Sequence, residues 1–212
     1  VDDDSLTVNL NTLTVRTPDG SKVLVNDLSF ELRRNQSLLI MGASGTGKSS
    51  VLRTIAGLWP IGAGALERPP WRDIMFLPQR PYMIDGNLRD QLLYPYTDQA
   101  LNDDQILAVV DKVNLADVLD RVDSDLDRAM DWTNVLSIGE QQRVAFARLF
   151  LRNPKFAFLD EATSALDEDN QERLYQMLQE SRIGFISVGH RTTLTKYHDR
   201  VLQLDRSGRW EI

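Results

Sequence analysis

The stretch "SLLIMGASGTGKSS", from Ser37 to Ser50, most restricts what this chain of 212 residues can fold into. It begins as a short apolar run that ends in Gly42, as a buried strand does. The residues that follow fit the pattern G-x-x-x-x-G-K-[ST] and continue into "KSSVLRTIAGL", which suits a helix. A strand, a Gly-rich turn and a helix in this order predict a loop that binds phosphate. An ordinary Gly-rich turn before a helix is the alternative.

The residue types of this loop suit phosphate. Glycine lets the backbone amides curl round phosphate oxygens, and the helix N-terminus adds a partial positive charge. We expect Lys48 to reach the β- and γ-phosphates of a nucleotide and Ser49 to bind Mg²⁺. The predicted phosphate-binding residues are Gly42, Ala43, Ser44, Gly45, Thr46, Gly47, Lys48, Ser49 and Ser50. The later "GAG" at 62–64 is expected to be only a loop.

Composition narrows the kinds of site that the chain can build. It has no Cys and only two His residues, His190 and His198, which excludes thiolate metal sites and disfavours a His-rich zinc site. Carboxylates and hydroxyls remain, and these ligands suit Mg²⁺. The net charge of −7 disfavours broad binding to a nucleic-acid backbone, so we expect no nucleic-acid partner. No stretch approaches the roughly 20 apolar residues that span a bilayer.

Periodicity divides the chain into an α/β core and a helical insertion. In residues 6–32, apolar and polar residues alternate on both sides of the turn "PDGSK", which predicts two antiparallel strands. The runs "DIMFLP", "KFAFLD" and "IGFISVG" are typical of buried strands. Residues 59–70 are predicted to form a loop, and "RVLQLDRSGRWEI" a closing hairpin around Ser207-Gly208. Amphipathic segments fill the interval from Pro81 to Asn134. Alternating strands and helices predict a parallel sheet with an antiparallel N-terminal layer.

The strand "KFAFLD" ends in two carboxylates, Asp160 and Glu161. In nucleotide hydrolases with a loop of this kind, an Asp in this place holds Mg²⁺. The next carboxylate is suited to accept a proton from attacking water. A buried strand that ends in an acidic helix cap is the alternative.

"LSIGEQQRVAFARLFLRNP" followed by "FLDEATSALD" resembles the signature helix and the acidic strand of ABC-type ATPases. The resemblance covers nearly the whole chain. It implies a P-loop NTPase (RecA-like) core at 1–80 and 135–212, with an inserted α-helical subdomain at about 81–134, in one domain over 1–212. It also implies that Ser137 and Gly139, at a helix N-terminus, face the γ-phosphate of an ATP bound by a second subunit.

The resemblance assigns two more polar residues. "FLPQRPY" places Gln79 at a strand end, where the family has a Gln that senses Mg²⁺ and the attacking water. "ISVGHR" places His190 at another strand end, where the family's His contacts the γ-phosphate and holds water in line. The implied catalytic residues are therefore Glu161, His190, Gln79 and Lys48, and the implied Mg²⁺ ligands are Ser49, Asp160 and Gln79. His198 lacks such a context, and we expect a structural role for it.

The chain departs from the family pattern at three positions. Ile138 stands where the signature usually has Gly, and Asn35 where a turn usually has Gly. Asn tolerates the left-handed conformation, so the second departure is mild. Thr17 stands where the family commonly stacks adenine on an aromatic ring. Either another side chain covers the base, or the selectivity for the nucleotide is loose.

"RTIAGLWPIGAG", "LPQRPYMIDGNLRDQLLYP" and "GHRTTL" are similar to a narrower group, the subfamily D half transporters and their bacterial relatives. This implies a domain that binds and hydrolyses MgATP, a transmembrane domain elsewhere in a longer chain, and a second nucleotide-binding domain, expected to be an identical copy. We expect it at the cytoplasmic face of a membrane. A soluble ABC-type ATPase of DNA repair or translation, and a nucleotide sensor that does not hydrolyse, are the alternatives.

Overall fold

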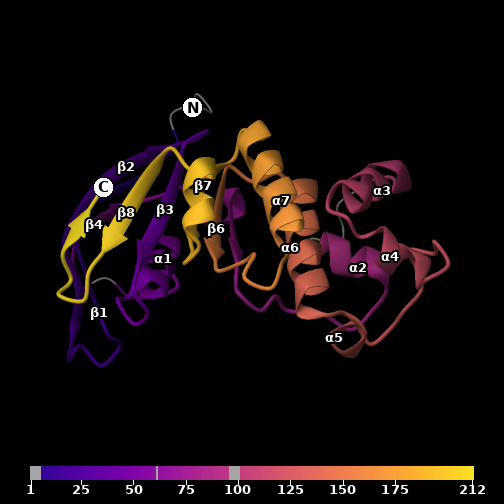
Figure 1. Ribbon diagram of the computed structural model, residues 1–212, viewed down its shortest axis with the longest axis horizontal. Coiled ribbons are helices and arrows are strands. Elements are labelled where there is room, and N and C mark those ends of the chain that lie inside the picture. The colour runs from indigo at the N-terminus through magenta and orange to yellow at the C-terminus, as the bar shows by residue number, and fades with distance from the viewer. Residues whose placement is uncertain (1–5, 61, 96–100) are drawn as a thin grey trace. The chain divides into compact units, whose positions relative to one another are not determined.

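The computed structural model describes residues 6–60, 62–95 and 101–212, which form two compact units. The first, called the core unit, comprises Val1–Phe76, Lys155–Glu161 and Leu178–Ile212. The second, called the helical unit, comprises Leu77–Pro154 and Ala162–Met177. Figure 1 labels most of the elements of both.

The core unit is built on two sheets. Their strands are β1 (Thr7–Arg16), β2 (Val23–Arg33), β3 (Ser37–Gly42), β4 (Ala63–Glu67), β5 (Ile74–Leu77), β6 (Phe156–Asp160), β7 (Gly184–Val188), β8 (Arg200–Leu204) and β9 (Trp210–Glu211). The smaller sheet has the antiparallel order β2-β1-β4. The larger sheet has the order β5-β6-β7-β3-β8-β9, in which β6, β7, β3 and β8 run parallel and β9 antiparallel. The predicted α/β class with an antiparallel layer is confirmed.

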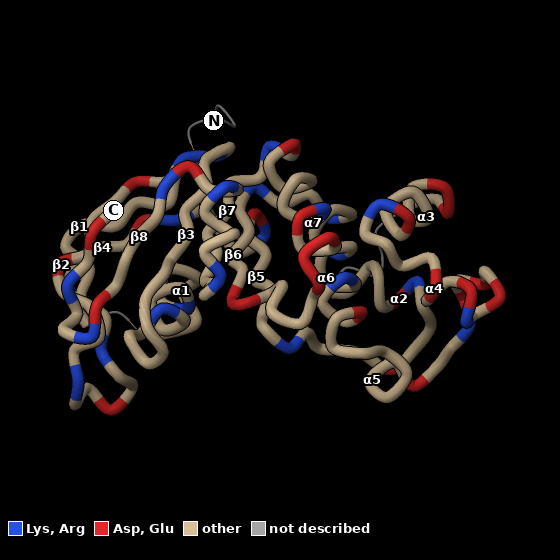
Figure 2. Tube along the Cα trace, viewed as in Figure 1, with Lys and Arg blue, Asp and Glu red and all other residues tan. Residues whose placement is uncertain are grey.

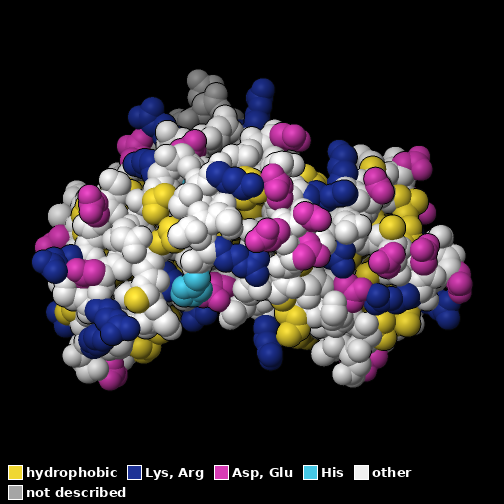
Figure 3. All heavy atoms as spheres, in the orientation of Figure 1, with side chains coloured by type: hydrophobic (Ala, Val, Ile, Leu, Met, Phe, Trp, Pro, Cys, Tyr) yellow, Lys and Arg dark blue, Asp and Glu magenta, His cyan; other side chains and the backbone are white. Residues whose placement is uncertain are grey.

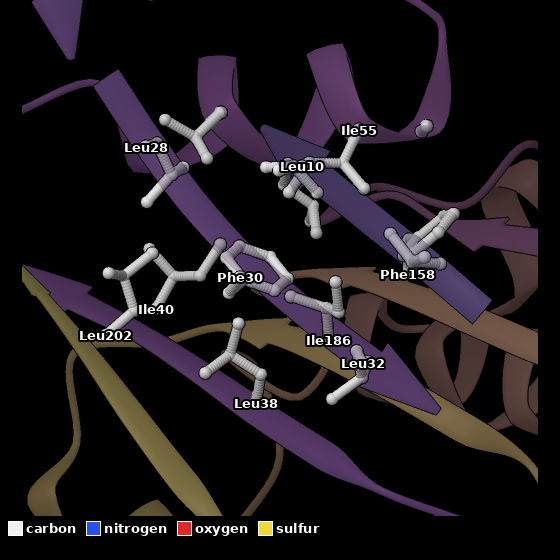
Figure 4. Close-up of a cluster of buried hydrophobic side chains, with 14 of the residues drawn as sticks. Leu10, Leu28, Phe30, Leu32, Leu38, Ile40, Ile55, Phe158, Ile186 and Leu202 are labelled. Carbon is white, nitrogen blue, oxygen red and sulfur yellow. The ribbon is translucent and has the colours of Figure 1, made fainter. Parts of the chain in front are cut away.

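The core of this unit lies where the two sheets and helix α1 (Lys48–Ala56) meet. Strand β2 contributes alternate residues, including Leu28, Phe30 and Leu32, because successive side chains of a strand point to opposite faces. Strands β6 and β7 are buried along their whole length, as expected for central strands of a parallel sheet. Figure 4 shows side chains of both sheets and Ile55 of α1 in one cluster. This packing fixes the strand ends from which the polar side chains described below project.

The helical unit contains α2 (Leu88–Leu93), α3 (Asp103–Lys112), α4 (Ala116–Asp120), α5 (Trp132–Val135), α6 (Ile138–Arg152) and the beginning of α7 (Glu168–Glu180). Helix α6 packs against α2 and α3. Its buried Arg148 donates hydrogen bonds to backbone oxygens of Gln91, at 2.6 Å, and Tyr82, at 2.8 Å. Burial lowers the pKa of Arg148 to about 10, yet the guanidinium remains charged at neutral pH. It thereby ties α6 to α2 and to the segment before it.

Two details correct the sequence-based expectations. Residues 63–67 were expected in a loop, but they form β4, an edge strand that pairs with β1 through partners such as Leu10 and Leu66. The glycine of this strand, Gly64, has φ 89°, and a Cβ there would lie 2.3 Å from the carbonyl oxygen of Thr12. The two backbones therefore approach closely, and the strand carries no apolar run that would have revealed it. Helix α1 ends at Ala56, two residues earlier than expected. The closing hairpin of β8 and β9 is confirmed.

Acidic residues gather on the helical unit. Figure 2 shows them along α3, α4 and the loop that follows, and Figure 3 shows acidic side chains on the exposed face of the same unit. Two aspartates of this unit, Asp103 and Asp127, accept hydrogen bonds from Arg89 at 2.7 and 2.8 Å. Within the described ranges, none of the helices combines the length and the apolar composition needed to cross a bilayer.

Candidate functional site: the loop between β3 and α1

The loop between β3 and α1 has a backbone shape that depends on glycine. Gly42, Gly45 and Gly47 all have positive φ, and a Cβ on Gly42 would lie only 2.4 Å from the carbonyl oxygen of Leu204. Gly47 is the N-cap of α1 and offers no side chain to that helix. No N-cap side chain therefore competes for the first N–H groups of α1, and these can donate to an anion, as at other helix N-termini that follow a Gly-rich loop.

Lys48 lies inside the curve of this loop. Its Nζ donates hydrogen bonds to the carbonyl oxygens of Gly42, at 2.9 Å, and Ala43, at 3.0 Å. The residue is only 5% exposed. Burial lowers the pKa of its ammonium group, while the nearby carboxylates of Glu161 and Asp160 act in the opposite direction. A desolvated cation held in this way is ready to bind a phosphate oxygen.

Ser49 and Asp160 meet next to the loop. The Ser49 hydroxyl donates to Oδ1 of Asp160 at 2.6 Å, and Arg53 donates to Oδ2 at 2.8 Å. Asp160 ends β6 and is 3% exposed, so its negative charge is compensated by Arg53 rather than by solvent. A hydroxyl and a carboxylate at this separation are oxygen ligands of the type that Mg²⁺ prefers. The residues present therefore fit that ion.

Glu161 and His190 form a pair at the ends of neighbouring parallel strands. Asp160 of β6 is in register with Val188 of β7, so the residues that follow both strands emerge side by side. The Nε2 atom of His190 lies 2.6 Å from Oε1 of Glu161, with the ring N–H as donor. Glu161 has φ 51°, an uncommon value for a residue with a side chain, and its N–H donates to the Val188 carbonyl at 3.2 Å. Backbone strain of this kind is found at functional sites.

These groups line one cavity of about 350 Å³ in the core unit. The loop contributes Ser44, Gly45, Gly47, Lys48, Ser49 and Ser50, and the strand ends contribute Glu161 and His190. The remaining wall is formed by Thr17, Pro18, Leu24 and Trp59. Sequence patterns predicted the first two groups, but they did not predict Trp59. The structure thus brings together cationic, carboxylate and hydroxyl groups around a space large enough for a small ligand.

Ser137 and Gly139 begin helix α6 in the helical unit. Ser137 is the N-cap, and its hydroxyl donates to Glu140 Oε2 at 2.8 Å while it accepts from the Glu140 N–H at 3.2 Å. Burial opposes ionisation of Glu140, but hydrogen bonds from Arg121 and Ser137 lower its pKa overall. A Cβ on Gly139 would lie 3.1 Å from the Ala165 carbonyl oxygen. Ile138, the departure from the family pattern, is exposed.

Gln79 also belongs to the helical unit, just after β5. Its carbonyl oxygen accepts a hydrogen bond from Gln142 Nε2 at 2.9 Å, and Gln142 Oε1 accepts from the Ala165 N–H at 3.0 Å. Gln142 is fully buried on α6 and links the segment of Gln79 to the segment after β6. Gln142 was not predicted as a linking residue, although the doubled Gln in "EQQR", on an otherwise apolar helix face, was a usable signal.

His198 has a structural role, as expected from the sequence. Its Nδ1–H donates to the Leu194 carbonyl at 2.8 Å, so Nε2 is the acceptor for the Ser187 hydroxyl at 2.9 Å. The ring also packs edge-on against Phe185. Burial lowers the pKa of this histidine to about 4, although the Leu194 carbonyl and Asp199 act in the opposite direction. The imidazole is therefore neutral at physiological pH.

This histidine predicts a dependence of stability on pH. Because the pKa of His198 falls from its ordinary value of 6.5 to about 4 on folding, the unfolded chain binds the extra proton first as the pH drops below 6.5. The stability is complete above pH 6.5 and declines towards pH 4, by about 2 kcal/mol between pH 7 and pH 5. Urea unfolding of the wild type and of His198→Asn, which keeps a donor for Leu194, measures the effect. We expect a shallower decline in the variant, and equal slopes would contradict the assignment.

Comparison with known proteins identifies the family. The ABC transporter family profile matches residues 25–164. The chain belongs to the ABC transporter family. Its matched region spans the loop between β3 and α1, helix α6 and strand β6, so the chain is the ATP-binding domain, the ATPase part of such a transporter.

Several full-length relatives of this ATP-binding domain are known. It is 51% identical over 97% of its length to an uncharacterized ABC transporter ATP-binding protein of Synechocystis, and 44% identical over 96% to the lysosomal cobalamin transporter ABCD4 of Homo sapiens. The domain covers 31% and 35% of those two proteins, so it spans about a third of their length. The structure of a bacterial Atm1-family ABC exporter with ATP bound shares the fold, with a TM-score of 0.83, 24% identity, and coverage of 98% of this chain and 38% of that one.

Proposed function

We propose that this domain binds MgATP in the cavity of the core unit and hydrolyses its γ-phosphate. The observation that carries the proposal is the Glu161–His190 pair, with 2.6 Å between Oε1 and Nε2, in the wall of the same cavity as Lys48. Glu161 is placed to accept a proton from attacking water. His190 orients that carboxylate. Lys48 and the free amides of α1 stabilise the negative charge that develops on the transferred phosphoryl group.

Ser49 and Asp160 are the proposed holders of the metal, because their oxygens already lie 2.6 Å apart. Bound Mg²⁺ supplies positive charge to the phosphate oxygens. Arg53 keeps the second oxygen of Asp160 occupied and so orients the first towards Ser49. Gln79, which follows β5, is a third proposed Mg²⁺ ligand.

The proposed active form is a head-to-tail dimer of identical domains. The loop of residues 42–50 in one copy faces the beginning of α6 in the other, and the two sites are equal by two-fold symmetry. Ser137 and Gly139 support this, because they form the N-terminus of a 15-residue helix whose dipole favours a phosphate. Each ATP is then bound by both copies.

The proposed role of the cycle is to move a transmembrane domain in the longer protein, at the cytoplasmic face of a membrane. The relatives are about three times as long as this chain, and one is named as a lysosomal cobalamin transporter. We propose residues 79–82 as the docking segment. Tyr82 is 67% exposed, and its backbone oxygen accepts a hydrogen bond from Arg148 at 2.8 Å, so an exposed aromatic residue projects from a fixed backbone.

Calorimetric titration with MgATP and MgGTP tests nucleotide binding and its selectivity. We expect both to bind at micromolar concentration with similar affinity, because Thr17 has no ring and its hydroxyl is engaged with Asp19 in its own turn. Failure of both nucleotides to bind would refute the proposed function. A preference for ATP over GTP of more than about 100-fold, which corresponds to about 2.7 kcal/mol, would show instead that a residue hydrogen-bonds to the edge of adenine.

A further inference from the structure

The cavity has a phosphate end and a second end with a different character. Lys48 and the Gly-rich loop form the first. The wall outside the loop and the strand ends contains Thr17, Pro18, Leu24 and Trp59, which we take as the second end. Thr17 is engaged locally, since its hydroxyl donates to Asp19 and its N–H donates to the Lys22 carbonyl at 2.9 Å. Its side chain therefore offers no flat surface to a ligand.

Trp59 supplies that surface from another part of the chain. Helix α1 ends at Ala56, and its C-cap Gly57 has a left-handed backbone (φ 76°) that turns the chain two residues before Trp59. The indole Nε1–H then donates to the carbonyl oxygen of Arg16 at 2.9 Å. This bond ties the ring to the end of β1, next to Thr17. The side chain is half-buried, so part of the ring remains accessible to a ligand.

The residue types in the wall indicate which part of a nucleotide binds at each end of the cavity. A triphosphate needs the cation and backbone amide donors, which the described lining of the cavity provides in the loop and at the start of α1. The base and sugar must then extend towards Thr17, Pro18 and Trp59. Among the described residues that line the cavity, Trp59 provides the only indole or phenyl ring. Bases stack on such rings with little dependence on their identity, because every base has a π-face.

We propose that Trp59 is the platform on which the nucleotide base stacks, in place of an aromatic residue at position 17. This inference rests on the proposed function. The stacking ring then comes from the segment between α1 and β4 instead of the β1–β2 turn. The hydrogen bond to the Arg16 carbonyl places this ring beside position 17. Because stacking depends little on the identity of the base, an indole platform separates ATP poorly from GTP.

The test compares four ligands and four proteins. Wild type, Trp59→Leu, Trp59→Phe and the matched control Trp71→Leu are titrated with MgATP, MgGTP, MgUTP and magnesium tripolyphosphate. Trp71 lies on the short helix η2 (Trp71–Asp73), is 44% exposed and is absent from the cavity wall. Trp59→Leu removes the ring and keeps an apolar side chain, whereas Trp59→Phe keeps a ring and removes the N–H donor.

We expect Trp59→Leu to weaken ATP and GTP roughly 5- to 150-fold and to leave tripolyphosphate unchanged. Trp59→Phe should retain most of the ATP affinity, and Trp71→Leu all of it. The change in tryptophan emission on adding ATP should disappear in Trp59→Phe although ATP still binds.

Unchanged ATP affinity in Trp59→Leu would overturn the platform and leave the proposed function standing. Equal losses for ATP and tripolyphosphate would also overturn it, since Trp59 would then act only by holding the end of β1. If wild type bound tripolyphosphate and no nucleotide, the platform and the proposed function would both be wrong.

Discussion

Lys48→Ala is expected to abolish ATP binding at micromolar nucleotide. The ammonium group is buried in the curve of the loop, and hydrogen bonds to a charged group contribute about 1.5–3 kcal/mol. Their loss corresponds to an affinity roughly 10- to 150-fold lower. Isothermal titration calorimetry with MgATP measures the difference directly.

Two controls separate ligand binding from folding in this experiment. Lys48 also bonds to the carbonyl oxygens of Gly42 and Ala43, so the unfolding of the variant must be compared with that of the wild type. Lys112→Ala removes an exposed cation from the helical unit and should leave ATP affinity unchanged. An Ala variant at position 48 that folds normally and binds ATP like the wild type would remove Lys48 from the phosphate site.

Glu161→Gln is expected to slow hydrolysis by about 10²- to 10⁴-fold and to leave an ATP-bound dimer. The amide keeps the size of the side chain and can still hydrogen-bond to His190, but it cannot accept a proton from water. It also removes a negative charge near the γ-phosphate, so ATP should bind no worse. With hydrolysis blocked, nothing opens an interface that holds ATP between residues 42–50 of one copy and Ser137 and Gly139 of the other.

Size-exclusion chromatography with and without MgATP checks the dimer. We expect a dimer only with MgATP, since the net charge of −7 should favour monomers otherwise. A matched variant is Glu168→Gln, which removes a carboxylate in the first turn of α7 and should change neither the rate nor the assembly. A monomer in both runs, with ATP shown to be bound, would exclude the head-to-tail arrangement. Full activity in Glu161→Gln would exclude the proton-accepting role.

The sequence was most informative where residue type and spacing are dictated by chemistry. The loop of residues 42–50 could be predicted because its backbone needs glycine and its ligand needs a cation. Glu161 and His190 could be predicted to lie at strand ends. Their contact, however, depends on β6 and β7 being neighbours in register, which no local pattern contains.

Features that depend on tertiary contacts were missed. Strand β4 has almost no apolar alternation, and only its pairing with β1 makes it a strand. Trp59 lies in a stretch that was expected to be a loop. Its ring lines the cavity because its indole N–H donates to the carbonyl of Arg16, which is 43 residues earlier in the chain. Gln142 resembles any polar residue of a helix until its buried bonds to Gln79 and Ala165 are seen.

Steady-state phosphate release from MgATP by the wild-type domain tests the central claim most directly. We predict release well above the rate without protein, with a rate per domain that rises with protein concentration, because each site needs a second copy. Glu161→Gln, run in parallel, should release phosphate at no more than about a hundredth of this rate. ATP binding by the wild type without any release above the blank, at concentrations where the dimer forms, would contradict the account and favour a nucleotide sensor instead.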